Sequence, residues 1–121
     1  MPVLDASVLL SFLKGEEGSE EAEGLLSTGK VSAANWSEVA QKIKFFGGDW
    51  AVTESLLKDY GLEVVPVLEE DAVYAADIWR KGAGLSLGDR LCLALGARLG
   101  DIVVTADRAW GQSEGVRQLR G

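Results

Sequence analysis

The sequence predicts an α/β fold in which a parallel sheet is covered by helices on both faces. Short apolar runs alternate along the chain with longer segments whose apolar residues recur at helical spacing. Glycines mark several of the boundaries between these segments. The chain has 121 residues, of which 47% are hydrophobic, so we expect one domain, residues 1–121.

We expect the first half of the chain to contain two short strands and three helices. The expected order is a strand at Val3–Leu4, helices over Ser7–Leu13 and Gly18–Ser27, a short strand at Lys30–Ala33 and a helix from Asn35 to Phe46. The last helix carries an apolar stripe that begins at Trp36, and we expect Asn35 or Ser37 to cap its start.

The second half repeats the alternation of helices and strands. We expect a helix over Trp50–Tyr60, a strand at Leu62–Val67, a helix over Glu69–Lys81, a glycine-rich loop over Gly82–Gly88, a helix over Leu87–Leu99, a strand at Ile102–Val104 and an edge strand at Gly115–Leu119. The helix over Leu87–Leu99 is almost wholly apolar, which predicts burial on most of its sides.

Composition excludes several classes of function. The formal net charge of −7 argues against a general polyanion-binding surface. Because the chain has no histidine, Ser-His-Asp and Cys-His triads, histidine-ligated zinc and a histidine general base are excluded. The single Cys92 is expected to be a small buried hydrophobe, which fits a reducing cytoplasm. Without a long apolar run or a signal segment, we expect a cytoplasmic protein that does not span a membrane.

Two aspartates directly follow predicted strands. Asp5 ends the first strand, and Asp107 lies just beyond the strand at Ile102–Val104. In an open parallel sheet, ligands bind outside the carboxyl ends of the strands. We therefore expect both side chains to face one crevice, although they lie at opposite ends of the chain.

Four acidic blocks carry a resemblance to a known family. They are VLDASVLL with Asp5, NWSEVAQKI with Glu38, SLGDRLCLALGARLG with Asp89 and IVVTADRAW with Asp107. In this order, and over nearly the whole chain, they resemble the PIN-domain ribonucleases and, within them, the small toxins of VapBC toxin–antitoxin pairs. The resemblance implies a three-layer α/β/α sandwich and an endoribonuclease whose four acids hold Mg²⁺ or Mn²⁺. It further implies a homodimer that a cognate antitoxin silences.

Elementary chemistry agrees with such a site. Hydrolysis of an RNA phosphodiester without histidine needs another way to make hydroxide and to offset charge, and a hard cation held by carboxylates supplies both. Mg²⁺ or Mn²⁺ suits a cage of oxygen ligands. Without a cation, converging carboxylates would repel each other by about 4 kcal/mol per pair at ~4 Å and an effective dielectric constant near 20. Convergence would therefore imply a metal or shifted pKa values.

Each acid also has a purely structural interpretation. Asp5 and Asp107 can cap the turns that follow them. Asp89 follows Ser86 at the spacing of a capping box. Glu38 falls roughly opposite the apolar stripe of its helix, where an exposed glutamate is ordinary. The sequence alone leaves these alternatives open.

Hydroxyls and arginines flank the acidic blocks. Ser7 and Thr105 either orient an acid or a bound water, or make local turn hydrogen bonds. The neighbouring arginines are expected either to contact RNA phosphates or to form surface ion pairs; they are Arg90, Arg98 and Arg108.

Other surfaces could meet a partner. We expect one of two arrangements for the aromatic residues Phe45, Phe46 and Trp50. They either form an exposed apolar patch or pack between neighbouring helices. The acidic stretch Glu16–Glu23 meets basic antitoxin residues or is a solvated face.

Two rival functions follow from the same residues. One is a catalytically silent PIN-like module that binds protein or RNA, with the acids kept as caps. The other is a phosphotransferase of the haloacid dehalogenase type with Asp5 as nucleophile. That chemistry normally needs a second aspartate two residues later, where this chain has Ser7.

Overall fold

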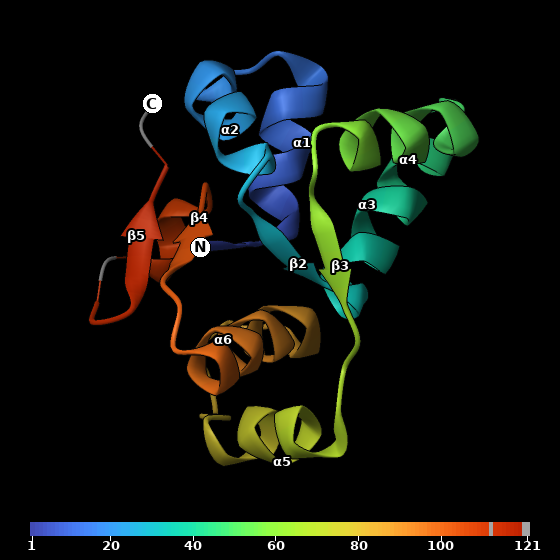
Figure 1. The fold of residues 1–121 in the computed structure, drawn as a ribbon. Helices are drawn as coiled ribbons and strands as arrows, with labels where there is room; N and C mark the ends of the chain where they lie inside the picture. The colour runs from blue at the N-terminus through green and yellow to red at the C-terminus, as the bar shows by residue number, and fades with distance from the viewer. Residues whose placement is uncertain (112, 120–121) are drawn as a thin grey trace.

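The computed structural model describes residues 1–111 and 113–119. Strands and helices alternate along most of the chain (Figure 1). The strands are β1 Val3–Leu4, β2 Lys30–Ser32, β3 Glu63–Val65, β4 Val103–Thr105 and β5 Val116–Gln118. The helices are α1 Ala6–Lys14, α2 Ser19–Leu26, α3 Ala33–Phe45, α4 Trp50–Asp59, α5 Glu69–Asp77 and α6 Leu87–Leu99, and a 3-10 turn, η1, covers Arg108–Trp110.

All five strands pair in parallel, in the order β3-β2-β1-β4-β5. β1 therefore lies at the centre of the sheet, and β4 lies beside it in a register that pairs Leu4 with Val104. Because parallel strands end at the same edge, the residues that follow β1 and β4 are neighbours. The predicted parallel sheet is confirmed, with β5 as its predicted edge strand, and β4 begins one residue later than predicted, at Val103.

Helices cover both faces of the sheet, and the sheet separates the core into two clusters. Adjacent residues of β1 point to opposite faces, so Leu4 joins one cluster and Val3 the other. The Leu4 cluster is built with α1, α2, α3 and α4, whereas the Val3 cluster is built with α6, which α5 covers from outside. Cys92 is fully buried in the second cluster, as predicted. The arrangement is the three-layer α/β/α sandwich that the family resemblance implies (Figure 1).

The start of α3 differs from the prediction. α3 begins at Ala33 because Ser32, the last residue of β2, caps it by accepting a hydrogen bond from the amide of Ala34 at 3.2 Å. Neither Asn35 nor Ser37 is the cap. Asn35 instead lies in the first turn of the helix, where its side chain is available for another role.

Two further helices also depart from expectation. α5 ends at Asp77 rather than at Lys81, and the Arg80 side chain donates hydrogen bonds to the carbonyl oxygens of Asp77 at 3.1 Å and Trp79 at 2.9 Å. A cation there is favourable because the carbonyl end of a helix is negative. α6 has the predicted bounds but is buried along one face only, with Leu87 58% exposed. Among the described residues, no helix has the length and apolar composition needed to cross a membrane.

Candidate metal centre

Asp5 lies at the carboxyl end of the central strand, caps α1 and is only 4% exposed. Its Oδ1 accepts hydrogen bonds from the hydroxyl of Ser7 at 2.6 Å and the amide of Val8 at 3.1 Å. Its Oδ2 accepts one from the hydroxyl of Thr105 at 2.5 Å. Burial raises the pKa of this carboxyl group more than the three hydrogen bonds lower it, and the negative charge of Asp89 raises it further.

Ser7 and Thr105 also hold the turn after β4 against the turn after β1. The amide of Ala106 donates to Ser7 Oγ at 2.8 Å, and the amide of Asp107 donates to Thr105 Oγ1 at 3.0 Å. The two hydroxyls therefore orient Asp5 and fix the backbone that carries Asp107. The exposed carboxylate of Asp107 caps η1, where its Oδ1 accepts a backbone amide at 2.9 Å.

Glu38 and Asp89 lie where α3 packs against the start of α6. Asp89 forms the predicted capping box with Ser86, with hydrogen bonds of 2.9 and 3.1 Å. Glu38 is half-buried rather than on an open helix face, and its Oε1 accepts a hydrogen bond from Nδ2 of Asn35 at 2.6 Å. A Cβ at Gly88 would lie 2.6 Å from that oxygen, so the glycine leaves the space that the carboxylate occupies.

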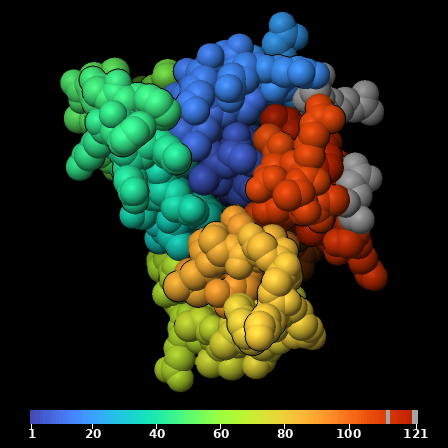
Figure 2. Space-filling view, turned by 180° about the vertical axis from the view of Figure 1, so that it is seen from behind, coloured from blue at the N-terminus to red at the C-terminus, as the bar shows by residue number. Residues whose placement is uncertain are grey.

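Three of the acids, Asp5, Glu38 and Asp89, share one neighbourhood. Burial raises the pKa of the Cys92 thiol well above its usual value, and the charges of all three acids raise it further. In Figure 2, the dark blue start of the chain lies recessed between the teal segment of α3, the orange segment of α6 and the red-orange segment that follows β4. Asp107 is carried by the last of these segments and is joined to Asp5 through the two hydroxyls.

The donor set fits a hard divalent cation. Three of the acids each keep one carboxylate oxygen without a hydrogen-bond partner in the described part of the chain, namely Oε2 of Glu38, Oδ1 of Asp89 and Oδ2 of Asp107. Mg²⁺ and Mn²⁺ bind oxygen ligands of this kind. Within residues 1–111 and 113–119, no three acids already form a closed ligand cluster.

Two residues of this site, Asn35 and Gly88, are not assigned to it by the sequence pattern. Asn35 is 1% exposed, and its Nδ2 also donates to the carbonyl oxygen of Gly88 at 3.2 Å. Its Oδ1 is buried and has no hydrogen-bond partner among the described residues. The available signal was the spacing of Asn35 and Glu38, since residues three apart lie on the same side of a helix.

Two of the three flanking arginines are engaged within the fold. Nε of Arg98 donates to Asp71 at 2.8 Å, in an ion pair that joins α6 to α5. Nη1 of Arg90 donates to the carbonyl oxygen of Ala75 at 2.8 Å. The ion-pair alternative is therefore the correct one for Arg98, and both side chains serve the packing of α5 on α6.

Arg108 is the flanking arginine that faces outward. It is exposed and forms no ion pair within the described ranges. It borders a cavity of about 380 Å³ that Ser7 and Lys14 also line, together with the acidic pair Glu16–Glu17. Because Ser7 donates to Asp5, this cavity opens beside the acidic group.

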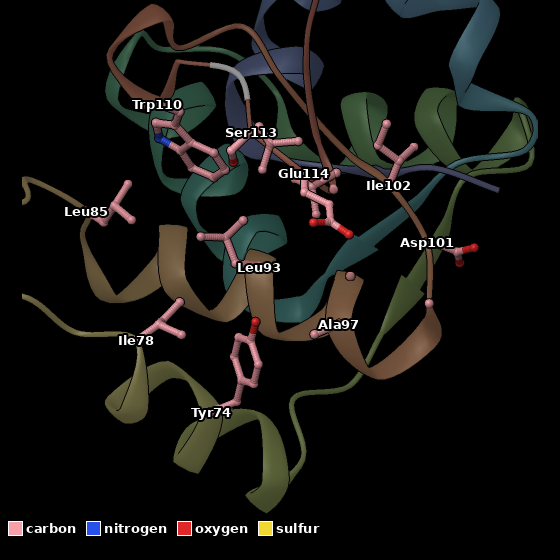
Figure 3. A pocket seen from close by; sticks show the side chains of 15 residues that line it. Tyr74, Ile78, Leu85, Leu93, Ala97, Asp101, Ile102, Trp110, Ser113 and Glu114 are labelled. Atoms are coloured by element: carbon pink, nitrogen blue, oxygen red, sulfur yellow. The ribbon is translucent and has the colours of Figure 1, made fainter.

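A second cavity, of about 580 Å³, lies apart from the acids. It is bordered by α5, α6 and the chain around β4 and β5, and Figure 3 shows Tyr74, Leu93 and Trp110 on its walls. None of the four candidate acids lines it. It is therefore not part of the candidate metal centre.

The aromatic residues Phe45, Phe46 and Trp50 divide between the two arrangements that the sequence left open, an exposed patch and packing between helices. Phe45 and Phe46 are 78% and 62% exposed. Trp50 instead packs edge-on against Trp36, with ring centroids 4.9 Å apart, and so belongs to the packing between α3 and α4.

The PIN-domain family model matches residues 3–114. The chain therefore belongs to the PIN-domain family, whose members are typically nucleases that use a divalent metal. No curated protein sequence matches the chain.

Several solved structures of toxin–antitoxin proteins share the fold. A toxin–antitoxin complex from Klebsiella pneumoniae aligns with a TM-score of 0.79 at 18% identity, over 97% of this chain and 96% of that one. The DNA-bound VapBC from Salmonella typhimurium aligns at 0.69 and 20% identity, over 97% and 95%. VapC20 from Mycobacterium tuberculosis, a toxin that cleaves the sarcin-ricin loop, aligns at 0.71 and 15% identity, over 94% and 98%. The chain is a PIN domain with the fold of VapC toxins, as the acidic blocks predicted.

Proposed function

We propose that this PIN domain is a metal-dependent endoribonuclease, the toxin of a toxin–antitoxin pair. The observation that carries the proposal is the buried carboxyl group of Asp5, whose pKa is raised by burial and further by the charge of Asp89. A buried carboxylate that faces more negative charge is costly unless a cation is present. The chain also belongs to a family whose members are typically nucleases, which supports the same activity.

One or two Mg²⁺ or Mn²⁺ ions would be held by Asp5, Glu38, Asp89 and Asp107. When bound, such an ion supplies hydroxide from water near neutral pH and offsets the charge that develops on the RNA phosphate. The chain supplies the placement of the ligands. Ser7 and Thr105 hold Asp5 in one orientation through both of its oxygens. The other three acids come from α3, α6 and the turn after β4, so the ligands reach the site from separate elements.

Removing single charges tests the proposal. Asp5→Asn and Asp89→Asn are expected to abolish RNA cleavage in Mg²⁺, because each removes a ligand charge while leaving a side chain that can cap a helix. Asp49→Asn is the matched control, since Asp49 caps α4 through the amide of Val52 but lies outside the acidic group. All three variants should keep the wild-type circular dichroism spectrum. Cleavage by Asp5→Asn at the normal rate would contradict the mechanism.

One observation also favours a second candidate, a catalytically silent module that binds protein or RNA. Asp5 and Asp107 cap the turns that follow them, and Asp89 completes the capping box that Ser86 begins. Metal titration separates the two functions: millimolar Mg²⁺ or Mn²⁺ raises the Tm of a protein with a metal site, whereas acids that serve only as caps give no rise. A phosphotransferase is disfavoured, because this chain has Ser7 where that chemistry normally needs a second aspartate.

We propose that the protein is a homodimer whose partner is a cognate antitoxin. The support is the shared fold with a protein solved as a toxin–antitoxin complex. The exposed Phe45 and Phe46 offer an apolar surface, and the stretch Glu16–Glu23 offers negative charge to basic residues of a partner. Purification from the native source should yield a small bound protein, and size-exclusion chromatography should give the mass of a dimer of this chain in the complex. Recovery without any small partner would count against the proposal.

A further inference from the structure

We infer that Asn35 is a positioning residue that sets the spacing between Glu38 and Asp89. The inference rests on the proposed function, since it concerns how these two acids reach a shared ion. It is carried by the hydrogen bonds of the Asn35 amide, by the buried oxygen of that amide, and by the glycine that faces Glu38.

The side-chain amide of Asn35 joins two helices. Nδ2 donates one hydrogen to Oε1 of Glu38 at 2.6 Å, within α3, and the other to the carbonyl oxygen of Gly88 at 3.2 Å, in α6. Gly88 directly precedes Asp89. One amide group therefore fixes the carboxylate of one acid relative to the backbone that carries the other.

The orientation of this amide is determined by its partners. Both groups that contact Nδ2 are acceptors, so turning the amide over would place oxygen against oxygen. Oδ1 of Asn35 is consequently left buried without a partner among the described residues, which destabilises the fold. An apolar side chain at this 1% exposed position would avoid that cost. The amide is thus suited to holding the acid rather than to stability.

Gly88 completes the arrangement from the opposite side. With a Cβ at this position, Oε1 of Glu38 would be 2.6 Å away and its carboxyl carbon 2.9 Å away, both closer than ordinary contact. The carboxylate therefore lies directly against the backbone of α6. With Oε1 held by Asn35, Oε2 has no hydrogen-bond partner in residues 1–111 and 113–119 and is the oxygen available to an ion.

Asn35 keeps Glu38 in place before an ion binds. Glu38 and Asp89 repel each other, and a long side chain without a donor at its tip gains freedom by moving toward solvent. The hydrogen bond from Asn35 opposes both effects. Removal of a group that orients a metal ligand typically weakens metal affinity or activity by 10–100-fold.

Mn²⁺ binding to the purified full chain, measured by isothermal titration calorimetry, tests this role. Asn35→Leu keeps the branched shape of the side chain in a somewhat larger volume, Asn35→Ala favours the helix, and both remove the donor. We expect each to weaken Mn²⁺ binding by about 10-fold or more. The Mg²⁺ concentration for half-maximal RNA cleavage should rise as well, with part of kcat recovered at saturating Mg²⁺. Val39→Ala is the matched control, because it opens a cavity beneath the same helix, beside Glu38, and leaves the amide in place.

The outcomes separate cleanly. Weaker Mn²⁺ binding in the Asn35 variants with unchanged binding in Val39→Ala would support the inference. Unchanged affinity in the Asn35 variants would overturn it, as would an equal loss in Val39→Ala. If circular dichroism shows that neither Asn35 variant folds, Asn35 is a residue of the fold and the inference is also overturned. Wild-type protein that neither binds Mn²⁺ nor cleaves RNA would instead refute the proposed function.

Discussion

Gly88→Ala tests how closely Glu38 must approach α6. The new Cβ would lie 2.6 Å from Oε1 of Glu38, whereas ordinary contact begins at 3.4 Å. The carboxylate must therefore withdraw by about 0.8 Å, the difference between these two distances. Because the carboxylate is the end of a flexible side chain, it can move by rotation while α3 and α6 stay in place.

A displacement of this size exceeds the tolerance of a metal site. Productive geometry must be held within about 0.5 Å. We therefore expect Gly88→Ala to weaken Mn²⁺ binding and to slow RNA cleavage by about 10–100-fold. The free energy of unfolding should not fall in step, because alanine is favoured over glycine in a helix, by roughly 0.5–1 kcal/mol in the interior and by less in the first turn, where Gly88 lies. That gain offsets the weaker hydrogen bond between Asn35 and Glu38.

The assay compares Mn²⁺ titration, cleavage of a fluorogenic RNA oligonucleotide and urea unfolding on the same preparations. Gly24→Ala is the control, since Gly24 also lies in a helix, α2, and a Cβ there would meet no atom within 4 Å. This control should gain helix stability and keep its metal binding. If Gly88→Ala binds Mn²⁺ and cleaves RNA as the wild type does, Glu38 is not a ligand in this position and the reasoning is refuted.

Three other predictions concern separate parts of the molecule. Without metal, Asp5→Asn should raise the Tm at pH 7. Burial raises the pKa of Asp5, so the ionised form costs stability as the pH rises above the ordinary aspartate range. Calorimetry that shows a lower Tm for the variant at pH 7 would contradict this. Arg108→Gln should raise the KM for RNA about tenfold, roughly 1.4 kcal/mol, with little change in kcat. Lys58→Gln on α4 is the control, and steady-state kinetics should show no change for it. An equal KM for the two variants would mean that Arg108 does not bind RNA. Burial disfavours charged Asp71, but hydrogen bonds from Arg98 and a backbone amide outweigh it and lower the pKa of Asp71. The stabilising contribution of ionised Asp71 is complete above the ordinary aspartate pKa and is lost as the pH falls through the lowered value. Asp71→Asn should therefore cost about 3 kcal/mol at pH 7, and the free energy of unfolding in urea should fall less steeply in acid than it does for the wild type. An unchanged fall in acid would argue against this.

Features encoded in a local run of sequence could be predicted. Asp5 and Asp107 follow apolar strands, and a parallel sheet aligns the ends of its strands however far apart they are in the chain. The start of α6 was also predictable, because Ser86 and Asp89 form a capping box within four residues.

Contacts between helices could not be predicted in this way. Asn35 is a good cap by residue type, but pairing of β2 with its neighbours carries the strand to Ser32, which takes the cap instead. Gly88 resembles a loop glycine until α3 packs against it and brings Glu38 to its backbone. Arg98 forms its ion pair only because α5 lies on α6. One sequence does not specify which helix faces meet.

The central claim is that four acids from separate segments share one site for a divalent cation. Anomalous scattering from crystals soaked in Mn²⁺ tests it most directly. We predict one or two anomalous peaks between Asp5 and Asp89, within reach of Glu38 and Asp107. A map with no peak among these side chains, or with Mn²⁺ bound only elsewhere, would contradict the claim.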